Sequence, residues 1–371
     1  MQPTVIARAD RLYSLDALRG FDMFWIMGAD EIFHTLYKST GSSFWGGLSK
    51  EMIHPDWHGF HFYDLIFPLF IFIAGVATPY SIDRELERGK SKKQLLWKVI
   101  KRGLLLVLLG IIYNNGLHIR PLEEIRFGSV LGRIGLAYMF ANIIYLYTKQ
   151  VSQAIWFGGL LIGYWLLLKF TAAPGFAAGD LTMEGNFASY MDRVLMPGKL
   201  YLGIHDPEGL FSTIPAVGNC LLGILAGNYI KTFKGAGTQK ALYLLVAGLI
   251  FIVLAHLWHL DFPLNKNLWT SSFVLNTGGY SLVLLSVFYY LIDVLGYKSW
   301  AFFFKVIGMN SILIYLSGHF INWDYTNEAV FGWLGQLMGN PFGIVALAAS
   351  FVLLKWFFLY FLYKKKAFLK I

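Results

Sequence analysis

The sequence contains ten stretches of about twenty mainly apolar residues, the length that an α-helix needs to cross a bilayer core. Backbone groups in lipid must be hydrogen-bonded internally, which makes these stretches helices. Only 14% of the residues are charged, whereas a soluble domain carries about 25%. We therefore predict an all-α polytopic membrane protein with about ten transmembrane helices. The expected spans are 13–36, 62–82, 96–115, 128–147, 151–170, 211–230, 240–257, 270–293, 301–321 and 341–363.

Lysine and arginine are distributed unequally over the connections between these spans. Alternate connections lie on opposite sides of the membrane. The side that includes both chain ends carries twenty lysines and arginines, and the other side carries eight. Positively charged connections stay in the cytoplasm, so we predict that both chain ends face the inside. The net charge of +9 is then a basic collar at the membrane surface, which argues against a nucleic-acid partner. We find no linker or repeat, and we expect residues 1–371 to form a single transmembrane domain.

With this topology, all nine histidines fall at the outer end of the protein. They are His34, His54, His58, His61, His118, His205, His256, His259 and His319. Three of them precede the second span, together with Asp56, and Asp64 opens that span. Ionisable side chains at the edge of a membrane helix are costly and indicate a functional site. Imidazole titrates near working pH, so this end is expected to handle protons or ligands.

The histidine cluster has several interpretations. A zinc site fits the spacing of His54, His58 and His61, but Pro55 and Gly59 interrupt a helix there, and we expect no metal. The histidines can instead be interfacial residues satisfied by water and headgroups. One of them can act as a general base or acetyl carrier, or the set can relay protons in a transporter. The residues alone leave these functions open.

Charged residues also lie inside the expected spans. Arg19 and Asp30 share one face of the first helix, which is compatible with a polar stripe through the membrane. Asp64 in the second span and Arg133 in the fourth are expected to pair in a structural or orienting role. The single cysteine, Cys220, lies in an apolar run and is expected in the core.

A series of motifs follows in order along nearly the whole chain. They are Ser14-Leu15-Asp16-Ala17-Leu18-Arg19-Gly20, His54-x-x-Trp57-x-Gly59, Asp64-Leu65-Ile66-Phe67-Pro68, Val130-Leu131-x-Arg133-Ile134-Gly135, Asp206-Pro207-Glu208-Gly209, Thr213-Ile214-Pro215-Ala216, Pro263-Leu264-Asn265-Lys266-Asn267-Leu268-Trp269-Thr270 and Gly308-Met309-Asn310-Ser311-Ile312-Leu313-Ile314-Tyr315. In this order they resemble the heparan-α-glucosaminide N-acetyltransferase family of membrane acyltransferases. The chain resembles a bacterial-type member without the large lumenal domain of the animal enzyme, and we expect it in a bacterial cytoplasmic (inner) membrane.

The resemblance implies that acetyl-CoA enters from the cytosol and that the acetyl group passes to an amino sugar on the far side. The histidine of the His-x-x-Trp-x-Gly motif is the family's catalytic residue, which corresponds to His54. Asp30 occupies the position of an asparagine that lies beside this histidine in the animal enzyme. His58 also replaces an asparagine. The resemblance further hints at a homodimer.

Topology and resemblance together predict a donor site at the inner end and an acceptor site at the outer end. Arginines suit the phosphates of CoA, and the expected donor-binding residues are Arg19, Arg88, Arg102, Asn310 and Ser311. Carboxylates suit a sugar ammonium and an aromatic ring suits a pyranose face. The expected acceptor-binding residues are His58, Asp206, Glu208, Lys266, Asn267, Trp269 and His319. The alternatives are a plain turn for residues 206–209 and a helix-start loop with an interfacial aromatic anchor for residues 266–269.

The resulting hypothesis is an acetyl-CoA-dependent N-acetyltransferase acting on a glucosamine-type amine. In it, His54 is the general base or acetyl carrier, and Asp30 orients it or tunes its pKa. O-acetylation of a cell-envelope glycan is the alternative within the same class. A proton-coupled small-solute transporter is the alternative outside it.

Overall fold

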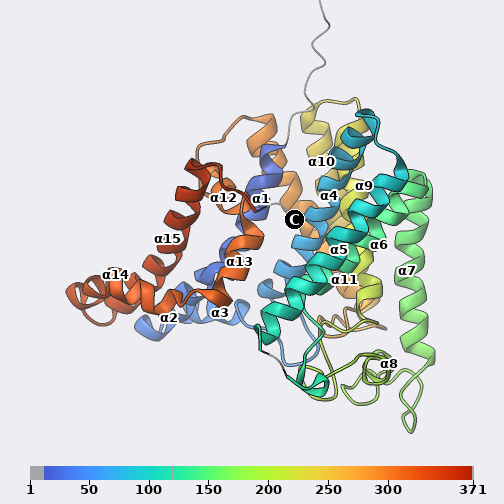
Figure 1. Ribbon diagram of the computed structural model, residues 1–371, viewed down its shortest axis with the longest axis horizontal. Coiled ribbons are helices and arrows are strands. Elements are labelled where there is room, and N and C mark those ends of the chain that lie inside the picture. The colour runs from blue at the N-terminus through green and yellow to red at the C-terminus, as the bar shows by residue number, and fades with distance from the viewer. Residues whose placement is uncertain (1–11, 119, 370–371) are drawn as a thin grey trace, which may run out of the picture.

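The computed structural model describes residues 12–118 and 120–369, and their regular structure is helical. Long helices run side by side in one bundle (Figure 1). They are α4 (Ile66–Glu87), α5 (Lys92–Asn115), α6 (Val130–Tyr147), α7 (Gln150–Phe170), α9 (Thr213–Thr232), α10 (Gly237–His259), α11 (Ser271–Phe288) and α15 (Phe342–Lys364). Within the described ranges, β pairing is limited to one isolated bridge between Arg126 and Gly198. The all-α prediction is confirmed.

Seven helices are long and apolar enough to cross a membrane, and a bent pair makes an eighth candidate. These eight correspond to eight of the ten expected spans. The expected third span is the continuous helix α5, but Lys98, Lys101 and Arg102 lie in its first half and reduce its apolar length. The expected first span is a broken helix. The count of ten and the orientation of the chain stay predictions.

The first span is divided into α1 (Tyr13–Phe24), the π-helical turn η1 (Trp25–Ala29) and α2 (Asp30–Thr40). Gly28 adopts a φ of 109° inside the π-helical turn, a conformation that residues with a side chain rarely adopt. The break frees the carbonyl of Met27, which accepts a hydrogen bond from Lys355 Nζ of α15 at 2.9 Å. The expectation of one straight helical face from Arg19 to Asp30 is therefore wrong.

The ninth span is also broken. α12 (Ala301–Gly308) and α13 (Ser311–Phe320) meet at an angle of 64° around Met309 and Asn310. Gly308 packs directly against α1, and a Cβ at Gly308 would collide with the carbonyl oxygen of Asp16. Backbone-to-backbone contact of this kind is the usual role of small residues between membrane helices.

Glycines also bring the central helices α4 and α9 together. A Cβ at Gly75 would collide with the backbone of Cys220, and a Cβ at Gly223 would collide with that of Phe72. Cys220 is fully buried, as expected. The two helices form the centre of the bundle, so α4 is a rigid support for the residues at its two ends.

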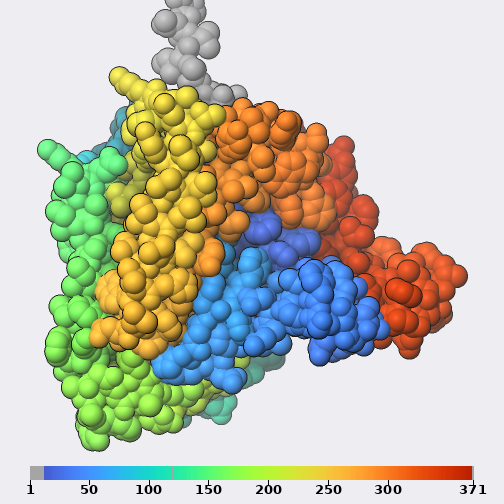
Figure 2. Space-filling view, turned by 180° about the vertical axis from the view of Figure 1, so that it is seen from behind, coloured from blue at the N-terminus to red at the C-terminus, as the bar shows by residue number. Residues whose placement is uncertain are grey.

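Shorter elements gather at the end of the bundle drawn at the bottom of Figure 1. They are α3 (Ser43–Glu51), the 3₁₀ turns η2 (Phe62–Leu65) and η3 (Leu122–Glu124), α8 (Phe187–Leu195) and α14 (Trp323–Met338). A further π-helical turn, η4 (Tyr289–Val294), extends α11 at the opposite end. Seen from behind, α14 and the adjoining part of α15 protrude beside α2 and α3 (Figure 2). We call the end with α3 and α8 the outer end, and the end with the lysine-rich connections the basic end.

Candidate active site

The loop 52–61 carries His54 and connects α3 to the turn η2 at the start of α4. His61 closes this loop, because its Nδ1 lies 2.7 Å from the carbonyl oxygen of Ile53. The backbone N–H of His61 donates to Asp64 Oδ2 at 2.9 Å. Pro55 and Gly59 prevent a helix here, and these side-chain bonds hold the irregular loop against α4.

Asp64 also binds the side chain of His54, with a distance of 2.7 Å from Oδ1 to His54 Nδ1. Asp64 is fully buried, whereas 45% of the His54 side chain is exposed. An ionised carboxylate only accepts hydrogen bonds, so Nδ1 of a neutral His54 carries the proton and Nε2 is left basic. The pair therefore presents a basic nitrogen to the outer end of the protein.

Lys266, in the connection between α10 and α11, lies against this imidazole. Its Nζ is 2.7 Å from His54 Nε2 and 3.7 Å from Asp64 Oδ1. Burial lowers the pKa of Lys266 and the charge of Arg133 lowers it further, while Asp64 and Glu208 act in the opposite direction. The site therefore holds a second side-chain nitrogen at hydrogen-bond distance from His54.

Asp30 does not orient His54 in the way the sequence indicated. Asp64 makes the direct bond to His54, whereas Asp30 forms a hydrogen bond with Tyr63. The Tyr63 ring lies 5.1 Å from the His54 ring, measured between centroids. Because the chain bends at Gly28, Asp30 starts a new helix and reaches His54 only through Tyr63.

The expected pair of Asp64 and Arg133 is wrong. Arg133 is buried in α6, where Nη2 donates to the carbonyl of Gly209 at 3.3 Å and to Ser212 Oγ. Its guanidinium lies 4.6 Å from the centroid of a Trp269 ring. Asp64 is held by His54 and Lys266 instead, because loop 52–61 and the Lys266 loop bring these two side chains to the end of α4. Nη2 of Arg133 thus joins α6 to the start of α9, whereas its buried Nε and Nη1 have no hydrogen-bond partner among the described residues.

Trp269 is not an exposed platform for a sugar, because its side chain is fully buried. Its indole N–H donates to Asn219 Oδ1 at 2.9 Å, and its ring packs edge-on against Phe67 and Phe273. Its φ of 53° turns the chain sharply between Lys266 and α11. Trp269 thus anchors the loop that holds Lys266.

Asp206 and Glu208 are not free carboxylates either. Arg126 forms a bidentate pair with Asp206, at 2.9 and 2.8 Å, and also binds Glu208. Burial raises the pKa of Asp206, but the hydrogen bonds and charge of Arg126 outweigh it, so the pKa is lowered overall. Asp206 also accepts the backbone N–H of Tyr201 and therefore fixes the turn. Of the two acids, Glu208 keeps an electrostatic interaction with Lys266.

The remaining expected acceptor residues lie around this group. His58 is 3.2 Å from Asn265, next to Lys266, and burial together with nearby His259 lowers its pKa. Asn267 is partly buried in the same connection. His319 is exposed at the end of α13, with its ring 5.4 Å from that of Tyr113.

Tyr113 and Tyr315 were not expected at the site. Their rings stack with centroids 4.7 Å apart, and Tyr315 interacts electrostatically with Glu208 and Arg126. Glu208 therefore interacts electrostatically with both Lys266 and Tyr315. Tyr315 ends a motif quoted above, which is the signal in the sequence, whereas Tyr113 and Arg126 carry none.

Most of the other outer histidines have structural partners. Four of them form hydrogen bonds that tie their own segments together: His34 with Ser49, His61 with Ile53, His205 with Ser189 and His259 with Leu264. Among these outer histidines, His54 combines a buried carboxylate partner with an exposed ring. In the described part of the chain, no three His, Cys, Asp or Glu side chains are grouped to hold a metal ion.

A cavity of about 470 Å³ opens between α1, α4, α5 and the α12–α13 break. Four of the five expected donor residues line it, namely Arg19, Arg102, Asn310 and Ser311. Arg102 lies over the ring of Tyr138, 4.6 Å from its centroid. From the sequence we expected these residues, which belong to three separate spans, to form one site. In the structure they line one cavity.

Arg88 is the exception among the expected donor residues. It is exposed after the end of α4 and lies 3.6 Å from Glu85. Arg84, one turn earlier on α4, lines the cavity in its place. Arg88 does not line the cavity, because α4 ends at Glu87 and the Arg88 side chain lies beyond the cavity wall.

This cavity, which we call the donor cavity after the expected donor residues that line it, runs along α4 toward His54. It contacts this helix from Arg84 to Phe70, which is about 21 Å along the helix axis. Phe70 is six residues from Asp64, or about 9 Å along the same helix. One helix therefore connects the cavity at the basic end with the His54–Asp64 pair at the outer end.

A family model for "Heparan-alpha-glucosaminide N-acetyltransferase, catalytic" matches residues 11–253, which include the His54 loop and α5. The human heparan-alpha-glucosaminide N-acetyltransferase is 30% identical over 419 residues, covering 97% of this chain and 60% of the human protein. The chain belongs to this family. The mouse heparan-alpha-glucosaminide N-acetyltransferase is 29% identical over 425 residues, with 98% and 61% covered. The chain thus spans about 60% of the length of these curated relatives.

Membership in the heparan-alpha-glucosaminide N-acetyltransferase family confirms the resemblance read from the motifs. The match to the family's catalytic model covers His54 and Asp64, and the alignment with the human protein covers nearly all of this chain.

Proposed function

We propose that this protein transfers the acetyl group of acetyl-CoA to the amine of a glucosamine-type sugar across a bacterial cytoplasmic membrane. The donor would enter the cavity at the basic end, and the sugar would bind beside His54 at the outer end. The family relationship supports the reaction class. The observation that carries the proposal is the contact between His54 Nε2 and Lys266 Nζ, because an amine nitrogen already lies 2.7 Å from the basic imidazole nitrogen.

His54 acts as a general base in this proposal. The sugar ammonium first loses one proton to water. Nε2 of His54 then accepts a second proton as the neutral amine attacks the thioester carbonyl, so that a C–N bond forms and the C–S bond breaks. The imidazolium then returns this proton to the departing CoA thiolate. Asp64 holds the Nδ1–H tautomer and stabilises the imidazolium, as the carboxylate of a Ser-His-Asp triad does. A transient acetyl-His54 is the other route that the same nitrogen permits.

Lys266 keeps the amine position polar and positively charged in the absence of sugar. Because burial lowers its pKa, the lysine loses its proton more easily than an exposed lysine does. Glu208, close to Lys266 and Tyr315, is the carboxylate best situated to attract a sugar ammonium. The mainly apolar helix core between the cavity and His54 shields the thioester from water.

The test uses the purified full-length protein in detergent with radiolabelled acetyl-CoA and glucosamine. We expect labelled N-acetylglucosamine from the native protein and a loss of at least about a hundredfold in kcat for His54→Ala. His256→Gln is the matched control, since it replaces another exposed histidine at the outer end, and we expect nearly native activity from it.

Label in an ester rather than an amide would favour the O-acetylation of a glycan. A protein that transfers nothing in detergent, but takes up solute into sealed vesicles with a proton gradient, would instead be a transporter. Near-native turnover by His54→Ala would contradict the proposed role of this residue.

A further inference from the structure

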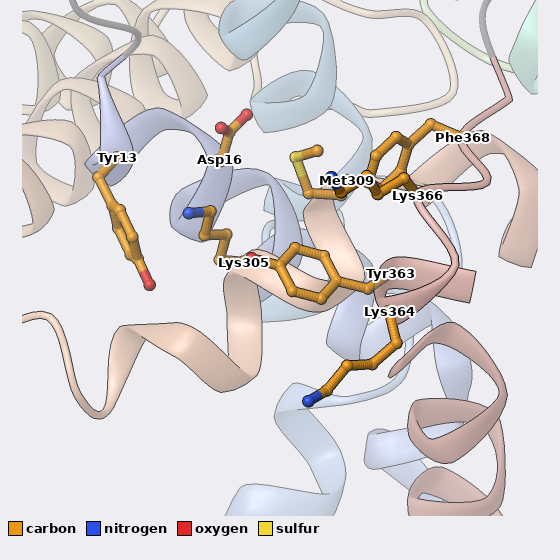
Figure 3. Close-up of a pocket in the computed structure, with 8 residues that line it drawn as sticks. All are labelled: Tyr13, Asp16, Lys305, Met309, Tyr363, Lys364, Lys366 and Phe368. Carbon is orange, nitrogen blue, oxygen red and sulfur yellow. The ribbon is translucent and has the colours of Figure 1, made fainter. Parts of the chain in front are cut away.

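A second cavity, of about 490 Å³, opens beside the donor cavity at the basic end (Figure 3). Its walls include three lysines, Lys305, Lys364 and Lys366, and two tyrosines, Tyr13 and Tyr363. We call it the lysine cavity. Figure 3 shows that the lysines come from two sides, with Lys305 on α12 and the other two at the end of α15.

The lysine cavity and the donor cavity share part of their walls. Asp16, Met309 and Phe368 line both of them. Phe368 belongs to the tail after α15, and this tail is tied to the α12–α13 break at two points. Asn310 Nδ2 donates to the carbonyl of Ala367 at 2.9 Å, and the N–H of Leu369 donates to Asn310 Oδ1 at 3.0 Å. The tail is therefore held in place and contributes to the walls of both adjoining cavities.

Lys366 stands in an unusual backbone conformation. Its φ of 54° is left-handed, its N–H donates to the carbonyl of Tyr363, and the N–H of Ala367 donates to the carbonyl of Leu362. These two bonds form a Schellman ending, in which the left-handed residue is usually glycine. A lysine in this position is strained, and strained residues are retained where their side chain has a function.

We propose that the lysine cavity binds the phosphate-bearing adenosine end of CoA while the donor cavity holds the pantetheine arm. This proposal rests on the proposed function and adds a subsite to it. CoA combines a polyanionic nucleotide with a long uncharged arm, and the structure provides a lysine-rich space that adjoins a cavity lined by arginines, which suit the diphosphate, and by apolar residues of α4, which suit the arm. Ammonium groups bind phosphates as point charges, so a cavity with three lysines among its lining residues fits the nucleotide end. A lipid phosphate would satisfy the same lysines, but the shared wall with the donor cavity favours the nucleotide.

The decisive variant is Lys366→Gly, because glycine keeps the left-handed turn while it removes the lysine side chain and its charge. Two donors are compared in the transfer assay, acetyl-CoA and S-acetylpantetheine, which lacks the nucleotide. We expect KM for acetyl-CoA to rise about fivefold and KM for S-acetylpantetheine to stay unchanged, since one phosphate contact is lost. Lys305→Gln should act in the same way. Lys365→Gln, which removes an exposed charge outside the cavity walls, is the matched control and should change neither value.

A binding measurement separates this subsite from the proposed function. Adenosine 3′,5′-bisphosphate should displace radiolabelled CoA from the native protein in equilibrium dialysis, and about five times more should be needed with Lys366→Gly. This result would support the subsite even if no acetyl transfer to glucosamine occurred. Equal effects of Lys366→Gly on both donors, or on neither, would overturn the proposal. It would also be overturned if adenosine 3′,5′-bisphosphate failed to compete and the lysine variants changed only binding to anionic lipid vesicles.

Discussion

The two ends of the bundle use their charged residues in opposite ways. At the outer end, charges are matched within short distances, with His54, Asp64 and Lys266 in one group and Arg126 with its two acids in another. At the basic end, arginines and lysines line two adjoining cavities, and Arg19 there pairs with Asp16 at 3.5 Å. In the proposed function, this difference lets the outer end move a proton and lets the basic end receive a large anion.

The largest effect on activity is expected from Asp64→Asn, which disrupts the group of His54, Asp64 and Lys266. The amide can donate to Nδ1 of His54, which moves the imidazole proton to Nε2 and removes the base. We expect kcat to fall on the order of a thousandfold, while CoA binding is retained. Asp56→Asn, an exposed acid in the same loop, is the control and should remain near native. A kcat for Asp64→Asn within tenfold of native would contradict the proposed tautomer.

A smaller effect is expected at the basic end, from Arg102→Gln. Arg102 lines the donor cavity, and loss of its charge should raise KM for acetyl-CoA about tenfold without changing KM for the sugar. Steady-state kinetics with each substrate varied in turn measures both values. Arg88→Gln is the matched control, because Arg88 lies outside the cavity with Glu85. If Arg88→Gln had the larger effect, the sequence-based assignment would be right and the cavity boundary wrong.

The outer end should also make stability depend on pH through His205. Burial lowers its pKa to about 4 in the folded protein, so the unfolded chain binds the proton more readily. Neutral His205 makes its whole contribution to the free energy of unfolding above pH ~6.5. As the pH falls toward 4 this contribution is lost, which lowers the free energy of unfolding by on the order of 3 kcal/mol. Burial raises the pKa of Asp192 to about 6, which has the opposite effect as the pH falls from 6 toward 4. The His205→Gln variant keeps Asp192. The difference in pH dependence of stability between the native protein and this variant is therefore the contribution of His205.

Thermal unfolding at pH 7 and pH 4.5 measures this difference. We expect the native protein to lose more stability on acidification than His205→Gln does. An equal loss in both proteins would assign the pH dependence to other groups.

Much of the fold was predictable because long apolar runs leave a membrane chain few alternatives to helices. Eight of the ten expected spans appear as helices or as a bent pair that are apolar enough to cross a membrane. The breaks at Gly28 and Met309 were missed, since they depend on tertiary contacts. A hydrogen bond from Lys355 and the close approach of Gly308 to α1 have no signature in a single helix.

The candidate site was predictable in its composition and not in its pairings. His54 and Asp64 were found from the motifs, but the irregular loop 52–61 decides that they contact each other. Trp269 shows the same limit, because the sequence predicted an exposed ring that binds a sugar, with an interfacial anchor as the alternative. Its positive φ and its bond to Asn219 instead bury it completely.

The most direct test of the account measures transfer across sealed membranes. Inverted vesicles expose the cytoplasmic side and are loaded with glucosamine, and radiolabelled acetyl-CoA is then added outside. The account predicts labelled N-acetylglucosamine inside these vesicles and none in right-side-out vesicles treated in the same way. Equal transfer in both preparations, or transfer in right-side-out vesicles alone, would contradict it.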